Sequence, residues 1–268
     1  MRPHRPRRNG PSPWLRTGRR HGARRDHRNA AGGDAVTLRQ THPLVLVGEV
    51  APLGDARHVS AIDKRPAAGP WRIGKTGVEG DAQADRKHHG GAEKALHHYA
   101  LDHYATWRDE IGAAPALDAP GAFGENLSTQ GWIEDDICIG DVIRFGGALL
   151  QVSQGRQPCF KLNLRFGLRD MARRVQMSGR TGWYYRVLEE GVANEGAALH
   201  LTERPCPDWP LTRLSHLLYR DMRDREGLAA MAALPHLAQS WRGLAQKRLD
   251  SGRVENWSAR LYGRQRAG

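Results

Sequence analysis

Cys159 is the residue of this sequence best placed for chemistry. It follows a short apolar run, residues 148–152, that predicts a strand, and a Gly/Pro turn that would expose it. Arg156 and Lys161 flank it, and nearby positive charges favour the deprotonated thiolate, the form that attacks electrophiles and binds metals. A lone cysteine is also commonly a small buried hydrophobe. The motif alone therefore leaves a reactive and a structural interpretation open.

Two further segments carry polar residues in suggestive positions. Residues 80–91 end in Lys87, His88, His89, Gly90 and Gly91, just ahead of a predicted helix. Paired glycines let backbone amides converge at a helix N-terminus, so this segment predicts a phosphate cradle, with an ordinary glycine turn as the alternative. In the second segment, residues 123–128, the side chains of Glu125 and Asn126 lie between apolar neighbours and predict a polar bend.

The remaining histidines and cysteines favour structural roles. His97, His98 and His103 lack the i, i+4 spacing of a helical zinc site, and His98 is expected to face the core. Cys138 alternates with apolar residues and predicts strand packing, whereas Cys206 lies in a turn. Three cysteines without a Cys-x-x-Cys pair indicate neither a disulfide framework nor a cysteine-rich zinc site, so we expect a reducing, cytoplasmic environment.

The hydrophobic pattern predicts a mixed α/β fold. Short strands separated by glycine-rich turns favour a compact β-barrel or sandwich over a doubly wound parallel sheet. The predicted strands cover residues 44–50, 137–145, 148–152, 183–188 and 197–202, and the helices within this domain cover 95–110 and 168–177. Further helices over residues 211–219, 225–233, 236–249 and 255–262 predict a small C-terminal helical domain. We place the barrel domain at residues 43–205 and the helical domain at residues 206–268.

Much of the net charge of +12 lies in the N-terminal segment. Residues 1–34 contain ten arginines against two aspartates, about +8, and few aliphatic side chains, so residues 1–42 are expected to form a disordered tail. A wrongly chosen upstream start codon and a basic arm for polyanions are the two explanations that remain open. Because the rest is only mildly basic, we do not expect nucleic-acid binding, and no apolar run is long enough to span a membrane.

Several motifs, taken in order, resemble one known family. They are Lys87 to Gly91 with Ala95 to Tyr99, Phe-Gly-Glu-Asn-Leu-Ser at 123–128, Gly140-Asp141, and Gln-Val-Ser at 151–153 followed by Arg156, Pro158, Cys159, Lys161 and Leu162. Together they resemble the MOSC-domain family, specifically its YiiM-like group with a C-terminal three-helix domain. The resemblance extends from about residue 45 to residue 263.

That resemblance implies a β-barrel-like domain that binds molybdenum cofactor, with Cys159 as molybdenum ligand or sulfur-handling thiol. Thiolate ligation suits a metal whose cofactor supplies a dithiolene. The residues expected to hold the cofactor's phosphate and negative charge are Arg156, Lys161, Lys87, Lys64, Gly90 and Gly91. Glu125 and Asn126 are expected to orient the pterin or substrate, and His89 to donate a proton.

The reaction implied by the resemblance is reductive removal of oxygen from N-hydroxylated small molecules such as hydroxylaminopurine bases. No flavin or nicotinamide fingerprint is visible, so a separate flavin- or NAD(P)H-dependent reductase is expected to supply electrons. The family also carries an association with pyridoxal phosphate, and a homodimer is left open. A sulfur carrier with a persulfide on Cys159 is the main alternative, and a nucleic-acid-binding module is the other.

Overall fold

The computed structural model of the chain describes residues 40–54, 58–82 and 90–263. Lys87, His89 and nearly all of the predicted tail therefore lie outside the described residues. Gln40 and Thr41, which the sequence analysis assigns to the tail, form the short strand β1 (Gln40–Thr41) and pair with β14 (Leu199–Glu203).

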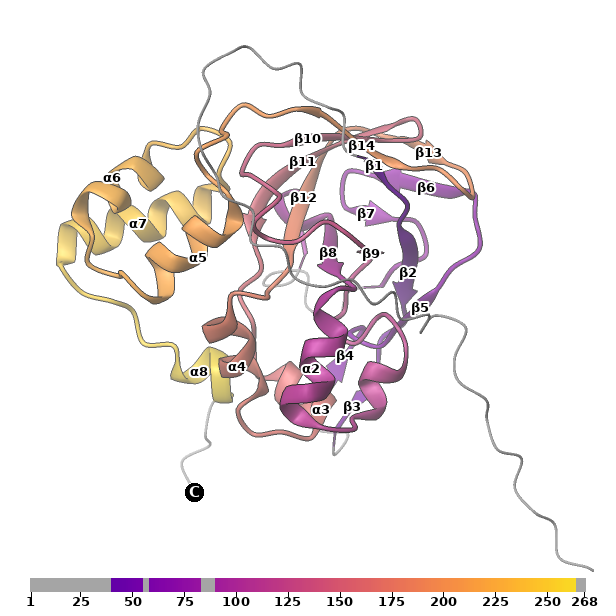
Figure 1. The fold of residues 1–268 in the computed structure, drawn as a ribbon, viewed down its shortest axis with the longest axis horizontal. Coiled ribbons are helices and arrows are strands. Elements are labelled where there is room, and N and C mark those ends of the chain that lie inside the picture. Colours follow the sequence, from indigo (N-terminus) through magenta and orange to yellow (C-terminus); the bar gives the residue numbers. More distant parts are fainter. Residues whose placement is uncertain (1–39, 55–57, 83–89, 264–268) are drawn as a thin grey trace, which may run out of the picture. The chain divides into compact units, whose positions relative to one another are not determined.

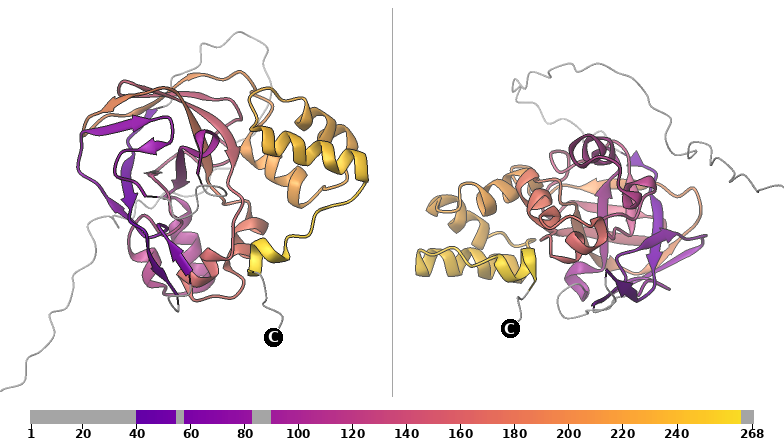
Figure 2. Two further views of the ribbon diagram at one scale, coloured as in Figure 1. Left: turned by 180° about the vertical axis from the view of Figure 1, so that it is seen from behind. Right: turned by 90° about the horizontal axis from the view of Figure 1, so that it is seen from below.

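A nine-stranded, curled sheet forms a half-barrel at the centre of the structure (Figures 1 and 2). Its strand order is β1-β14-β10-β11-β12-β8-β9-β2-β5, and only β8 and β9 pair in parallel. The strands not yet bounded are β2 (Leu44–Gly48), β5 (Lys64–Pro66), β8 (Leu96–Ala100), β9 (Leu127–Thr129), β10 (Val142–Phe145), β11 (Ala148–Gly155) and β12 (Trp183–Glu189). The expected mixed α/β fold with a barrel-like sheet is confirmed.

Two small sheets extend the half-barrel. β3 (Ala51–Leu53) pairs with β4 (His58–Ser60), and β6 (Trp71–Gly74) lies between β7 (Gly77–Val78) and β13 (Gly191–Ala193). The predicted first strand, residues 44–50, corresponds to β2, whose β-branched and apolar composition favours a strand and in which Val45 and Leu46 are both buried. The short β3–β4 pair ends at Ser60, which brings the following residues to the pocket described below.

The core consists of two clusters of buried side chains. One fills the space between the sheet and the C-terminal helices and includes Leu150, Leu214 and Trp241. The other lies under α2 (His103–Ile111), α3 (Lys161–Phe166) and α4 (Met171–Ser178), where Tyr99 stacks on Phe123 with ring centroids 4.0 Å apart. Because Phe123 also lines the pocket, the second cluster supports the site directly.

The C-terminal helices agree well with the sequence prediction. They are α5 (Leu211–Tyr219), α6 (Arg225–Ala232), α7 (Gln239–Ser251) and α8 (Ser258–Tyr262). The Asp224 side chain caps α6 by accepting from the Gly227 amide at 3.0 Å, and α7 ends at Gly252 in the left-handed region. α5, α6 and α7 lie together beside the sheet, whereas α8 lies next to α4 (Figure 1).

Two predicted elements are wrong in part. The predicted helix over residues 95–110 is strand β8 followed by α2, because residues 96–100 are all buried and pair on both sides with β12 and β9. A strand buried on both faces loses the alternation that marks strands in sequence. The predicted strand over 137–145 is shortened to β10 by a turn at Gly140, whose φ is +84°. Cys138 forms only an isolated bridge with Pro210.

Helix α3 was not predicted, and α4 begins three residues later than the predicted helix at 168. α3 has only six residues, and Gly167 in the left-handed region separates it from α4. Within the described residues, no helix is long and apolar enough to cross a membrane.

Candidate functional site

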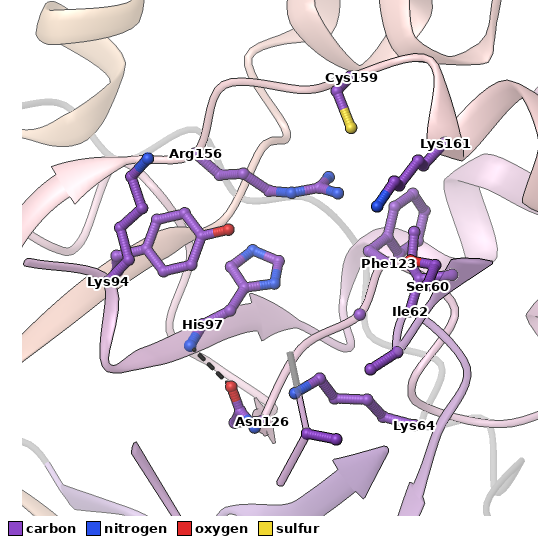
Figure 3. Close-up of a pocket in the computed structure, with 14 residues that line it drawn as sticks. Ser60, Ile62, Lys64, Lys94, His97, Phe123, Asn126, Arg156, Cys159 and Lys161 are labelled. Carbon is purple, nitrogen blue, oxygen red and sulfur yellow. Dashed lines mark hydrogen bonds between the residues drawn. The ribbon is translucent and has the colours of Figure 1, made fainter. Parts of the chain in front are cut away.

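A pocket opens where the end of β11, the start of α3 and the middle strands β8 and β12 meet (Figure 3). Residues from the segment after β4, from β5 and from the 121–126 loop complete its wall. The lining residues are Ser60, Ala61, Ile62, Lys64, Ala82, Lys94, His97, Phe123, Gly124, Asn126, Arg156, Cys159, Lys161 and Tyr184. Of the described residues predicted for the site, Cys159, Arg156, Lys161, Lys64 and Asn126 are brought together here.

Cys159 lies in the loop between β11 and α3 and is 8% exposed. Its carbonyl accepts a hydrogen bond from the Leu162 amide at 3.0 Å, which begins the first turn of α3. In Figure 3 its sulfur points into the pocket, as do the Arg156 guanidinium and the Lys161 ammonium. The thiol was predicted to be exposed at a turn; in the structure it is buried and faces a pocket with cationic side chains.

Arg156 is the most informative charged residue of the pocket. It is 7% exposed, and its Nη1 atom has no hydrogen-bond partner in the described part of the chain. Its amide donates to the Gly182 carbonyl at 3.0 Å, and its charged side chain lies near Tyr184 on the same pocket wall. Burial raises the pKa of Tyr184, an effect that Arg156 opposes. A buried guanidinium with an unused donor is unfavourable unless an anion binds it, so the pocket fits a negatively charged ligand.

His97 lines the same pocket from β8 and is uncharged. Burial, followed by the Arg156 charge, holds the pKa of His97 well below its ordinary value, while contacts with the Gly124 and Thr181 carbonyls act in the opposite direction. Its Nε2 lies 3.4 Å from the Thr181 carbonyl oxygen. A neutral imidazole adds no positive charge, so the pocket's cationic character comes from arginine and lysine.

Lys64 and Asn126 meet at Asp81 beneath the pocket. The Lys64 ammonium forms a short ion pair with Asp81, and the Asn126 amide donates to the same carboxylate at 2.8 Å and to the Leu46 carbonyl at 3.2 Å. Burial lowers the pKa of Lys64, and the Asp81 charge opposes that shift. Asn126 also accepts from the His97 amide at 3.1 Å. The side-chain oxygen and nitrogen of Asn126 therefore both form hydrogen bonds, and this residue orders the floor of the pocket.

Glu125 does not line the pocket. It is completely buried and accepts hydrogen bonds from the Gly121 and Phe123 amides at 2.8 and 3.0 Å and from the Tyr104 hydroxyl at 2.5 Å. Gly121 has a φ of +104°, and a side chain there would collide with the Lys64 carbonyl. Glu125 therefore shapes the turn that carries Phe123 to the pocket, and a direct contact with cofactor or substrate remains only a prediction.

The expected phosphate cradle at Gly90 and Gly91 lacks its helix. Gly91, with a φ of +94°, precedes the three-residue 3-10 helix η1 (Ala92–Lys94), which leads into strand β8. The helix-terminus argument for a phosphate therefore does not hold, because three residues form no extended helix dipole. The same turn places Lys94 on the pocket wall.

The other histidines and cysteines have structural surroundings, as expected. His98 is buried between the Tyr185 and Thr129 hydroxyls at 2.9 and 2.8 Å, and burial lowers its pKa to about 3. His103 contacts Glu134 at 2.6 Å. Burial raises the pKa of the Cys138 thiol to about 11. Over residues 40–54, 58–82 and 90–263, no group of three or more His, Cys, Asp or Glu side chains could hold a metal ion.

Sequence reasoning missed Lys94, His97 and Tyr184 as pocket residues. His97 and Tyr184 are cross-strand partners in the antiparallel pair of β8 and β12. Assigning residues 95–110 to a helix concealed this pairing. The apolar, β-branched and aromatic composition of 183–188 was visible, but its partner strand was not.

Comparison with known proteins identifies the family. Residues 85–200 match the MOSC domain, and residues 209–252 match the YiiM-like, 3-alpha helix domain. The chain is thus a MOSC-domain protein, as the half-barrel and the cysteine pocket indicate. It is 38% identical to Protein YiiM of Escherichia coli (strain K12) over 205 residues, 76% of this chain and 91% of that protein. It belongs to the YiiM-like group of the MOSC family.

Two further relatives and two solved structures support this assignment. Uncharacterized protein YflK of Bacillus subtilis (strain 168) is 40% identical over 71% of this chain and 85% of that protein. A Gibberella moniliformis protein (strain M3125 / FGSC 7600) named Reductase is 39% identical over 72% of this chain but only 34% of that protein. The crystal structure of Escherichia coli YiiM aligns with a TM-score of 0.72 and 32% identity, covering 84% of this chain and 100% of that chain. The crystal structure of YiiM from Geobacillus stearothermophilus aligns with a TM-score of 0.67 and 35% identity, covering 79% of this chain and 100% of that chain.

Proposed function

We propose that this protein binds molybdenum cofactor in the pocket around Cys159 and reduces N-hydroxylated small molecules with electrons from a separate reductase. The observation that carries the proposal is the juxtaposition of the Cys159 thiol with the buried, unpartnered Nη1 of Arg156. MOSC domains are associated with molybdenum cofactor at the family level, and one relative is named a reductase.

The donor set of the pocket suits a metal that brings most of its own ligands. The pocket wall offers one thiol, Cys159, together with the cationic side chains of Arg156 and Lys161, while the Lys64 charge is paired with Asp81. A soft thiolate suits molybdenum bound by a dithiolene, and the cations suit the negative charge of the dithiolene and the phosphate. Arg156 would hold an anionic part of the cofactor, and Cys159 would contribute the protein ligand.

The cofactor, when bound, supplies two-electron chemistry that the side chains lack. The overall change is R–NHOH + 2e⁻ + 2H⁺ → R–NH₂ + H₂O. The protein's part is to hold the anionic group with Arg156 and Lys161 and to keep the pocket floor rigid through Asn126. The predicted proton donor, His89, lies outside the described residues.

Electrons must come from another protein or module. The relative named Reductase matches this chain over only 34% of its own length, which leaves most of that protein for further modules. In that relative the matching segment is joined to additional sequence within one chain. This supports the proposal that the present, shorter chain works with a separate redox protein. We propose a flavin- or NAD(P)H-dependent reductase as that partner.

Metal and pterin analysis tests the proposal directly. The protein is produced in a host that makes molybdenum cofactor, and wild type is compared with Cys159→Ser and the matched control Cys206→Ser. We expect molybdenum and fluorescent oxidised pterin in wild type and in Cys206→Ser, and loss of molybdenum in Cys159→Ser. With a viologen dye as electron donor, wild type and Cys206→Ser should reduce 6-hydroxylaminopurine, and Cys159→Ser should not.

The sulfur-carrier alternative predicts a different result. Wild type would then lack molybdenum and pterin but would carry one additional sulfur atom on the Cys159 peptide, visible by mass spectrometry. That outcome, from well-folded protein, would overturn the proposed cofactor function.

A further inference from the structure

The loop that carries Cys159 is held on both sides by one residue of the C-terminal segment. Arg260 Nη1 donates to the Pro158 carbonyl at 2.6 Å, and the Phe160 amide donates to the Arg260 carbonyl at 2.7 Å. Pro158 and Phe160 are the immediate neighbours of Cys159. The side chain and the main chain of Arg260 therefore fix the peptide groups on either side of the thiol.

Arg260 is itself oriented by buried groups. Its Nη2 donates to Gln176 Oε1 at 2.7 Å, and Gln176 is 2% exposed. The neighbouring Leu261 carbonyl accepts from Asn163 Nδ2 at 2.7 Å, which joins α8 to α3. Both terminal nitrogens of the Arg260 guanidinium thus donate to a defined acceptor, which fixes the position of the side chain relative to the loop.

This contact comes from a part of the chain outside both family matches. The MOSC match ends at residue 200 and the three-helix match ends at residue 252, whereas α8 covers Ser258–Tyr262. Figures 1 and 2 show α8 next to α4, separate from the group formed by α5, α6 and α7. The segment after α7 thus returns to the half-barrel domain and contacts the loop of the pocket cysteine.

We propose that Arg260 is a positioning residue for Cys159. The loop depends on such a contact because Pro158 has no amide hydrogen and residues 157–160 lie between strand β11 and helix α3, outside both elements. Arg260 supplies a charge-assisted hydrogen bond to this loop and holds the sulfur toward the pocket. The inference rests on the proposed role of Cys159, but its test measures the thiol and not the cofactor.

The test is the alkylation rate of Cys159 relative to Cys206 in cofactor-free, full-length protein. Iodoacetamide labelling is followed peptide by peptide by mass spectrometry, so partly exposed Cys206 serves as an internal reference. Loss of a hydrogen bond from a charged donor should shift local opening of the loop by about tenfold. We expect Arg260→Ala to raise the Cys159 to Cys206 rate ratio by that factor, with Arg260→Lys between it and wild type.

Arg220→Ala is the matched control. Arg220 also joins the C-terminal helices to the half-barrel domain through a backbone carbonyl, that of Met177 at 2.6 Å, but it does not touch the Cys159 loop. Its rate ratio should equal that of wild type. A ratio in folded Arg260→Ala within twofold of wild type would overturn the proposal.

Gln176→Leu provides a second route if Arg260→Ala does not fold. It removes the Arg260 acceptor, while the Gln176 Nε2 atom that is also lost has no partner within the described residues. The same rise in the Cys159 ratio supports the proposal, and an unchanged ratio contradicts it. Because alkylation needs no molybdenum, a failure of the proposed cofactor function would leave this result readable.

Discussion

The rings of His97 and Tyr184 lie 5.0 Å apart between centroids and are inclined by 37°. The two residues are cross-strand partners in β8 and β12, and both line the pocket. The positive charge of Arg156 acts on Tyr184 and partly offsets the rise in its pKa that burial causes. The pairing of β8 with β12 thus places two aromatic rings beside the buried guanidinium of Arg156. A change in either ring should therefore alter the surroundings of that charge.

Replacing Tyr184 by Phe tests this expectation. The variant keeps the ring against His97 but removes the polar hydroxyl beside Arg156 in the pocket, so the cofactor anion should be held about fivefold more weakly. Molybdenum content after extensive dialysis measures the effect. Tyr185→Phe is the control, since the Tyr185 hydroxyl contacts His98 and does not line the pocket. Equal losses in both variants would contradict a specific role for Tyr184.

Arg156→Met should separate stability from function. Because Arg156 Nη1 is buried without a partner, replacing the guanidinium by a similar apolar side chain should leave the free energy of unfolding of cofactor-free protein unchanged or about 1 kcal/mol higher. Molybdenum retention should fall by at least about tenfold. Urea denaturation and metal analysis measure the two effects.

Arg204→Met is the contrast for that experiment. Arg204 pairs with the fully buried carboxylate of Asp141 at 2.7 Å. Its removal leaves an unpaired buried charge and should destabilise the protein by about 3–5 kcal/mol. If Arg156→Met were equally destabilising, the pocket arginine would be a structural residue and not an anion site.

The ion pair of Lys64 and Asp81 should show strong coupling. Asp81→Asn leaves the buried ammonium without its counter-charge and should destabilise the protein by about 3 kcal/mol, whereas adding Lys64→Met should recover most of that loss. Urea denaturation of both single variants and the double variant gives the coupling free energy. Strictly additive effects would show that the pair does not act as a unit.

The motif residues were predictable because their spacing is local. Cys159, Arg156 and Lys161 fall within six residues of sequence, so the turn after β11 necessarily brings them to one region. The helical segments 211–219 and 225–233 were also predictable, since amphipathic helices bury apolar side chains at a period that a sequence shows directly.

The pocket walls were not predictable for a different reason. His97 and Tyr184 meet through a strand pairing 87 positions apart, and β8 is buried on both faces, so no alternation marks it. Arg260 reaches the Cys159 loop from about a hundred residues away. Long-range contacts of this kind depend on tertiary packing and leave no local pattern.

Glu255 should make the C-terminal segment sensitive to acid. Its carboxylate pairs with buried Arg248 at 2.7 Å and accepts from Trp257 at 2.7 Å. Burial acts to raise the pKa of Glu255, but the hydrogen bonds from Arg248 and Trp257 more than offset this and hold it at about 2, against an ordinary 4.5. The unfolded state therefore binds a proton more readily, so this stabilisation is complete above about pH 4.5 and is lost as the pH falls toward 2.

Urea denaturation between pH 7 and pH 2.5 measures this dependence. Wild type should lose about 2–3 kcal/mol more than Glu255→Gln over the window below pH 4.5, because the amide cannot titrate. The buried imidazole of His98, whose lowered pKa also makes acid destabilising, is common to both proteins and cancels in the difference. Glu226→Gln, at an exposed position of α6, should follow wild type. Parallel curves for wild type and Glu255→Gln would mean that the pair with Arg248 adds nothing to stability.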